Sequence, residues 1–135
     1  MRKYVLMAIK PQYAYYIKEG TKTIELRKIA PKVNSGDMLI IYESAPISKI
    51  TAYGKIEHIF AMSPHELWKL VTGKVKIDED TYYDYFTHKK KAYGILIKEV
   101  KVLKKYKSLR EISKKYAPQN FYYITEKEFE TLIEE

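Results

Sequence analysis

Three charged side chains, Lys22, Glu25 and Arg27, form the group in this sequence best suited to chemistry. They lie in the run GTKTIELRK, residues 20–28, in which a glycine is followed by alternating polar and apolar residues. That alternation predicts a short strand with Glu25 and Arg27 on one face. A carboxylate set among cations holds their donors in place, which suits binding of an anion such as phosphate. The alternative is an ordinary edge strand with solvated charges.

A second group of polar side chains lies near the C-terminus. Gln119 and Asn120 stand in the run YAPQNFYY, residues 116–123, which we interpret as a loop rich in amides and aromatic rings. An amide both donates and accepts hydrogen bonds, which suits reading a base edge, and flanking rings can stack on the base. The alternative is a loop that Phe121 anchors to the core.

Three further polar residues stand where predicted strands end. Lys10 follows a continuously apolar strand and precedes a helix that begins at Pro11, while Tyr42 and Ser44 close another buried strand. Side chains at strand ends are available to a ligand. We expect Lys10 to face the same pocket as Lys22, and Tyr42 and Ser44 to be available to a ligand; the alternative is a solvated lysine and a plain loop.

These residues must be positioned by a mixture of short helices and strands. Gly54 and Gly94 stand inside long alternating segments and predict bends, as strands that wrap round a small barrel need. His58 falls on the apolar face of its segment and is predicted to be a core histidine. The predicted strands are residues 4–9, 23–27, 38–43, 50–60 and 92–103; the predicted helices are 11–19, 64–72, 79–86, 109–112 and 126–133.

Composition predicts one globular domain, residues 1–135, with a preference for polyanions. Hydrophobic residues make up 46% and charged residues 31%, and the net charge is +8, which favours nucleic acid as a partner. The absence of cysteine excludes disulfides, thiolate metal sites and cysteine nucleophiles. We predict no metal site and no cofactor. The apolar run at residues 4–9 is too short for a signal peptide or a membrane span, so we expect a cytoplasmic protein that does not enter a membrane. Abundant Tyr, Lys and Ile resemble a thermophile's composition.

Four stretches together resemble the ASCH domains of the PUA-like superfamily. They are LMAIKP at residues 6–11, GTKTIELR at 20–27, the Gly-Asp turn at 36–37 with YESAP at 42–46, and PQNF at 118–121, which is similar to the family's Pro-Gln-Ser-Phe. The resemblance covers nearly the whole chain. It implies an α+β fold, a small twisted and partly closed β-barrel flanked by several short helices. It also implies a cleft lined by the Lys-Glu-Arg strand and a role in RNA binding or RNA-linked chemistry.

Some proteins of this family look like amidohydrolases that deacetylate acetylcytidine with a Lys, a Thr and a Glu. Their Lys falls on Lys22, but their Thr falls on Glu25, and Thr23 is the nearest hydroxyl. By order along the chain, Asp78 and Glu79 are the candidates for their Glu. We expect Glu25 to raise the pKa of Lys22, which disfavours activation of a nucleophile. If the chain is an enzyme, Lys22 and Glu25 are its predicted catalytic pair.

The sequence therefore favours an RNA-binding module over an enzyme. Lys22, Arg27 and Lys10 are predicted to bind phosphate, while Gln119 and Asn120 hold an unstacked base of single-stranded RNA or a modified nucleoside. One alternative is a hydrolase, acting on acetylcytidine or as a ribonuclease. Another is a protein-interaction domain whose basic surface is incidental. The sequence predicts no oligomeric state.

Overall fold

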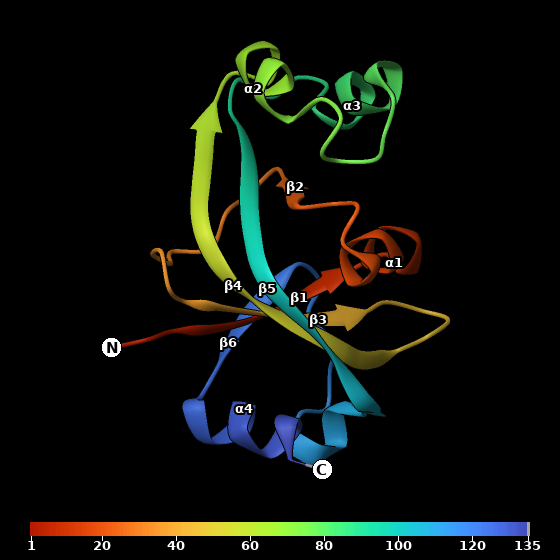
Figure 1. Ribbon diagram of the computed structural model, residues 1–135, viewed down its shortest axis with the longest axis vertical. Helices are drawn as coiled ribbons and strands as arrows, with labels where there is room; N and C mark the ends of the chain where they lie inside the picture. The colour runs from red at the N-terminus through yellow and green to blue at the C-terminus, as the bar shows by residue number, and fades with distance from the viewer. Residues whose placement is uncertain (135) are drawn as a thin grey trace.

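Six strands form one curved sheet with helices at both ends and along one side (Figure 1), in a computed structural model that describes residues 1–134. The strands are β1 (Tyr4–Ile9), β2 (Ile24–Arg27), β3 (Met38–Glu43), β4 (Lys49–Met62), β5 (Ala92–Lys107) and β6 (Phe121–Ile124). The helices are α1 (Pro11–Glu19), α2 (Pro64–Val71), α3 (Glu79–Tyr85), α4 (Glu126–Ile133) and the short 3-10 helix η1 (Leu109–Ile112).

The sheet has the strand order β2-β5-β4-β3-β1-β6. β1 runs parallel to β3, and every other neighbouring pair is antiparallel. β2 and β6 are the two edge strands, so main-chain pairing does not close the barrel in the described part of the chain. The predicted α+β fold with a twisted, partly closed barrel is confirmed.

The β4–β5 ribbon spans most of the length of the molecule, with α2 and α3 at one end and α4 near the other (Figure 1). Gly54 lies where the two strands approach closely, because a Cβ there would stand 2.7 Å from Ile97 Cγ2. At Gly94 a Cβ would stand 3.1 Å from Ile24 Cγ2, which brings β2 against β5. The glycines thus allow close contact between strands. β5 continues to Lys107, beyond its predicted end at residue 103.

Two expectations about elements are wrong. His58 is exposed, because the pairing of β4 with β5 shifts register between Ile56 and His58 and an inserted residue reverses the alternation of faces. The predicted loop at residues 116–123 gives way to β6 from Phe121 onward. These residues pair with β1, and a four-residue edge strand leaves little pattern in a sequence rich in tyrosine.

The end of α1 determines where the charged run begins. Gly20 has φ 90°, and its N–H donates to the carbonyl oxygens of Tyr16 and Ile17. This left-handed conformation costs little without a Cβ. The chain therefore turns directly from α1 into the segment of Lys22 and β2.

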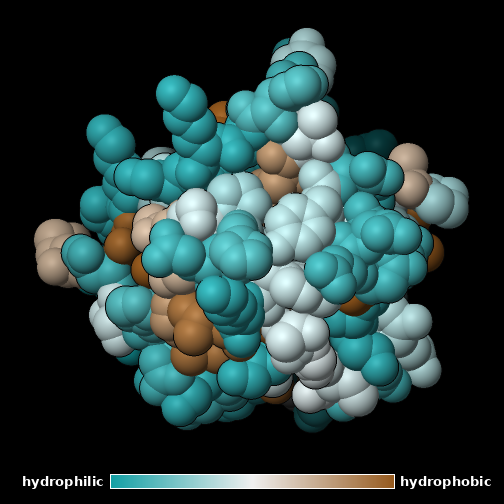
Figure 2. All heavy atoms as spheres, turned by 90° about the horizontal axis from the view of Figure 1, so that it is seen from above, coloured by the Kyte–Doolittle hydropathy of each residue, from teal (hydrophilic) through white to brown (hydrophobic). Residues whose placement is uncertain are grey.

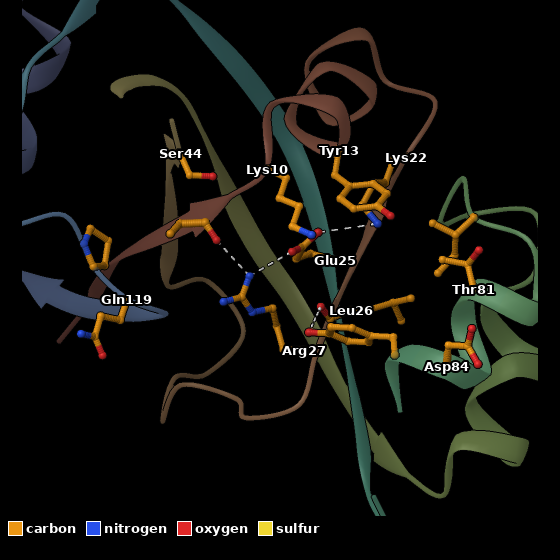
Figure 3. A pocket seen from close by; sticks show the side chains of 14 residues that line it. Lys10, Tyr13, Lys22, Glu25, Leu26, Arg27, Ser44, Thr81, Asp84 and Gln119 are labelled. Atoms are coloured by element: carbon orange, nitrogen blue, oxygen red, sulfur yellow. Dashed lines mark hydrogen bonds and ion pairs between the residues drawn. The ribbon is translucent and has the colours of Figure 1, made fainter. Parts of the chain in front are cut away.

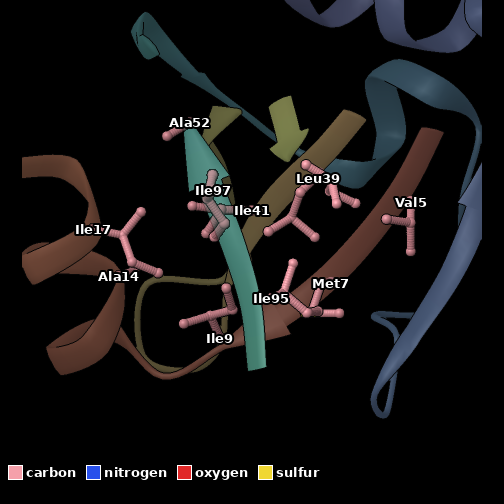
Figure 4. Packing of buried hydrophobic residues seen from close by; sticks show 11 residues of the cluster. Val5, Met7, Ile9, Ala14, Ile17, Leu39, Ile41, Ala52, Ile95 and Ile97 are labelled. Carbon is pink, nitrogen blue, oxygen red and sulfur yellow. The ribbon is translucent and has the colours of Figure 1, made fainter. Parts of the chain in front are cut away.

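Three hydrophobic clusters support this framework. The first joins α1 to the sheet and includes Val5, Met7, Ile17, Leu39 and Ile95 (Figure 4). The second packs the opposite face of β1 and β3 against α4, and the third lies beneath α2 and α3. None of the helices in residues 1–134 is both long and apolar enough to cross a membrane.

Candidate functional site

A cavity of about 610 Å³ lies among β2, α1, α3 and the loop before β6. Lys10, Tyr13 and Lys22 point toward its centre, while Thr81 and Asp84 stand on one side and Ser44 and Gln119 on the other (Figure 3). The predicted site residues that line it are Lys10, Lys22, Glu25, Arg27, Ser44 and Gln119. The structure thus brings together residues from four separate stretches of sequence.

Glu25 is the centre of the charge network on β2. Its Oε1 lies 3.6 Å from Lys22 Nζ, and its Oε2 lies 3.2 Å from Arg27 Nη1. The Lys22 and Glu25 side chains are 3% and 7% exposed, and that of Arg27 is 12% exposed. Two cations share one carboxylate in a place that water barely reaches, which leaves an excess positive charge facing the cavity.

Lys22 has lost most of its solvent. Its Nζ donates to the carbonyl oxygen of Val75 at 3.2 Å and lies 5.3 Å from the centre of the Tyr13 ring. Burial lowers the pKa of Lys22; Glu25 raises it by a smaller amount, and Arg27 lowers it further. The expectation that Glu25 leaves the pKa of Lys22 raised is therefore wrong. The pKa is lowered because the loss of hydration outweighs the ion pair.

Arg27 connects the two edges of the sheet. Its Nη1 donates to the carbonyl oxygen of Ala8 at 3.0 Å, and its Nη2 donates to the main-chain oxygen of Asn120 at 3.5 Å and to Asn120 Oδ1. Asn120 precedes β6, the edge opposite β2. The Asn120 amide, predicted to read a base, is thus engaged by Arg27 and does not line the cavity.

Two tyrosines that sequence reasoning missed line the cavity, Tyr13 from α1 and Tyr85 from α3. Burial raises the pKa of both phenols; Glu25 raises that of Tyr13 further, whereas Arg27 partly offsets the rise at Tyr85. Tyr85 Oη donates to the carbonyl oxygen of Leu26 at 3.4 Å, and Lys28 Nζ lies 4.6 Å from the centre of its ring. Both phenols stay protonated at neutral pH and provide O–H donors and aromatic surface. With fourteen tyrosines in the chain, no local signal singles out these two.

Several predicted residues lie elsewhere. Tyr42 is 6% exposed and packs in the second cluster, because its strand position directs it to the opposite face of β3. Thr23 is exposed and does not line the cavity. Asp78 caps α3 by accepting the N–H of Thr81 at 2.8 Å, and Glu79 is absent from the lining. The Lys-Thr-Glu set of the acetylcytidine amidohydrolases is therefore not assembled from these residues.

Comparison with known proteins shows the family of this chain. The sequence model of the ASCH domain family matches residues 7–133. A curated protein of Zymomonas mobilis named ASCH domain-containing ribonuclease is 24% identical over 135 residues, covering 98% of this chain and 91% of its own length.

Solved structures show the same fold. A crystal structure of the Zymomonas mobilis ASCH protein has a TM-score of 0.91 at 24% identity, covering 98% of this chain and 95% of that one. The N-terminal domain of Staphylothermus marinus McrB has a TM-score of 0.62 at 10% identity, covering 96% and 92%. At these identities the likeness to solved structures establishes the fold alone.

Proposed function

The chain belongs to the ASCH domain family, the PUA-like RNA-binding domains, and on that premise we propose that it binds single-stranded RNA in the cavity beside β2. The observation that carries this proposal is the excess positive charge around Glu25 in a cavity that also presents phenol rings. Phosphate contacts supply most of the affinity of RNA-binding proteins, and stacking on aromatic rings holds single-stranded bases.

Lys10 and Arg27 are the cations that reach RNA. Lys10 is exposed, lines the cavity and forms no ion pair with another residue of the described chain. Arg27 presents the remaining exposed part of its guanidinium. Lys22, at 3% exposure, instead contributes its charge from beneath the surface. Among the lysines predicted to bind phosphate, Lys10 is thus assigned the direct contact in place of Lys22.

The size and lining of the cavity fit a single nucleotide. About 610 Å³ falls within the roughly 300–1,000 Å³ of small-ligand sites. Leu26, Ile77 and Pro118 provide apolar lining, and Ser44 and Gln119 provide hydrogen-bonding groups at the rim. A paired base cannot enter such a space, so the partner is an unpaired segment whose base turns out of the strand.

A salt titration tests this proposal. Wild type and Lys10→Ala are titrated with a fluorescent single-stranded RNA at two salt concentrations. Lys10→Ala should bind more weakly, and the slope of log affinity against log salt should fall by about 0.7 for one lost phosphate contact. The matched control is Lys127→Ala, which removes an exposed lysine from α4, away from the cavity. Equal behaviour of the two variants would contradict the assignment.

RNA cleavage is a second candidate, because the Zymomonas mobilis relative is named a ribonuclease and burial lowers the pKa of Lys22. In the simplest metal-free reaction, a ribose 2′-oxygen attacks the adjacent phosphorus as its proton passes to a base. The bond to the next nucleotide's 5′-oxygen breaks as that oxygen takes up a proton, giving a 2′,3′-cyclic phosphate and a 5′-hydroxyl. Lys22 lines the cavity and releases its proton at a lower pH than an exposed lysine does, so in this second candidate function we assign proton transfer to it.

Mass spectrometry of the incubated RNA separates the two functions. Products that end in a 2′,3′-cyclic phosphate with wild type and are absent with Lys22→Met would assign cleavage to this site. RNA that stays intact with wild type would contradict the ribonuclease reading and leave binding. Release of acetate from acetylcytidine in the same assay would identify a modified nucleoside as the substrate.

A further inference from the structure

The α3 side of the cavity differs in chemistry from the β2 side. β2 presents cations, whereas α3 presents Thr81 and Asp84, a hydroxyl and a carboxylate. Figure 3 shows these two side chains next to each other, across the cavity from Ser44 and Gln119. The cavity therefore has one side for an anion and another that accepts hydrogen bonds.

The Asp84 carboxylate has no side-chain partner in the part of the chain that the structure describes. It is exposed at the cavity and forms no hydrogen bond or ion pair with another side chain in residues 1–134. Its position in the last turn of α3 is unfavourable for a negative charge, because the C-terminal end of a helix carries partial negative charge. Helix stability does not explain a carboxylate here.

The surface around α3 is hydrophilic and carries charges of both signs, with Asp78, Glu79 and Asp80 exposed where the helix begins. Figure 2 views this end of the molecule from above and shows hydrophilic residues round small apolar patches. The run His88 to Lys91 begins shortly after α3 ends at Tyr85, and all four residues are exposed. The Asp84 carboxylate repels a phosphate, so the group that reaches Asp84 is a base rather than a phosphate.

We propose that Asp84 makes this RNA site selective for guanine. The inference rests on the proposed function, since it concerns the base that enters the same cavity. Guanine offers two neighbouring donors on its Watson–Crick edge, N1–H and the N2 amino group, and a carboxylate can accept both at once. Adenine and cytosine place a ring-nitrogen acceptor beside their amino group, and uracil flanks its one donor with two carbonyls, so each presents repulsion to a carboxylate.

The neighbouring residues fit a base held in this way. Tyr85 follows Asp84, lines the same cavity and is 36% exposed, so part of its ring is available for stacking. The Thr81 hydroxyl lies one helical turn before Tyr85 and can accept or donate at the edge of the base. Guanine stacks well on aromatic rings, which adds to the selectivity of the carboxylate.

Binding of four short RNAs tests the proposal. Each is an eight-residue oligouridylate with one central guanosine, inosine, adenosine or cytidine, and its integrity is checked by mass spectrometry. Wild type should bind the guanosine RNA about tenfold more tightly than the adenosine and cytidine RNAs, since a bidentate contact discriminates by about this factor. The inosine RNA lacks the N2 amino group and should fall between them.

Two variants locate the selectivity. Asp84→Asn should lose the preference for guanosine while still binding the other RNAs at least as tightly as wild type. Asp80→Asn removes the same charge from an exposed position in the first turn of α3 that does not line the cavity, and it should keep the preference.

Each other outcome overturns the proposal. Equal binding of all four RNAs by wild type, with affinity still dependent on Lys10, would reject guanine selectivity and leave RNA binding standing. Loss of the preference in both variants would reject Asp84 as its source. Absence of binding to any of the RNAs would reject the proposed function and this inference together.

Discussion

Glu25 stabilises two cations that have little access to water. Lys22 and Arg27 lie 3.6 Å and 3.2 Å from its carboxylate oxygens. A buried ion pair contributes little relative to apolar residues, but removing one partner leaves an uncompensated buried charge, which is costly. Glu25 is therefore more important to folding than either cation.

Replacement of Glu25 tests this asymmetry. Glu25→Gln should lower the free energy of unfolding by about 3 kcal/mol, because two cations lose their counter-charge. Urea denaturation measures the change. Glu99→Gln is the matched control: its pair with Lys55 is exposed and should contribute about 0.5 kcal/mol or less. Similar losses in the two variants would show that Glu25 is effectively solvated.

The lowered pKa of Lys22 predicts a pH dependence. The lysine titrates near 10.5 in the unfolded chain and at a lower pH in the folded one, so between these values the unfolded chain binds more protons. The stability of wild type relative to Lys22→Met should therefore rise as the pH increases toward 10.5. Urea denaturation across that range measures it. A difference that stays constant or falls would contradict the lowered pKa.

Sequence alone identified the polar residues of β2 but not those of α3. Lys22, Glu25 and Arg27 lie in one short run. Their arrangement could be predicted because alternation and a glycine turn are local signals. Asp84 and Tyr85 reach the cavity only because α3 packs above it. The third hydrophobic cluster determines that packing, and no nearby motif encodes it. Asn120, predicted to hold a base, has Arg27 as its partner and does not line the cavity.

At the scale of elements, the β4–β5 ribbon depends on close contact at Gly54. A Cβ there would meet Ile97 Cγ2 at 2.7 Å and the Lys98 carbonyl oxygen at 3.2 Å. At Gly94 the nearest atoms would be Ile24 Cγ2 at 3.1 Å and Leu67 Cδ1 at 3.4 Å. The first position has main-chain atoms among its neighbours, which cannot move aside as side chains can.

The two glycines should therefore differ in their tolerance of alanine. Gly54→Ala should lower the free energy of unfolding by about 2–3 kcal/mol through overpacking, and Gly94→Ala by about 1 kcal/mol or less. Thermal and urea denaturation of both variants measures the contrast. An equal or reversed order would show that the ribbon yields at Gly54 more readily than its contacts suggest.

Most elements could be predicted because their ends carry chemical signals. Gly20 closes α1, while Ser63 and Thr125 cap α2 and α4 by accepting main-chain N–H groups. β6 and the bulge before His58 were missed for a different reason. Both are set by the register with a partner strand, which local residue types do not specify.

At the scale of the whole molecule, one side chain joins the two edges of the sheet. β2 and β6 are farthest apart in strand order, yet Arg27 donates to Ala8 and Asn120 beside β6. The barrel is closed here by a guanidinium rather than by a ladder of main-chain hydrogen bonds. The predicted partial closure thus has an identifiable residue behind it.

Removing the hydrogen bonds of Arg27 should destabilise the edge strands β2 and β6 before the rest of the sheet. Arg27→Met should raise amide hydrogen exchange in β2 and β6 by about tenfold, with smaller changes in β3 at the centre of the sheet. Arg110→Met, which removes an exposed arginine from η1, should leave the exchange of both edges close to that of wild type. A uniform rise across all strands in Arg27→Met would instead assign Arg27 to global stability alone.

Because Arg27 closes the barrel, the β2 and α3 walls of the cavity differ in how freely their residues can be changed. Substitutions on the β2 wall should alter the fold and the proposed ligand contacts together, because we assign the same guanidinium to both. Within residues 1–134, the Asp84 and Thr81 side chains form no hydrogen bond with β2 or β6, and both are exposed. New ligand preferences should therefore be easier to obtain by varying α3 than by varying β2, in the laboratory and in the divergence of related chains.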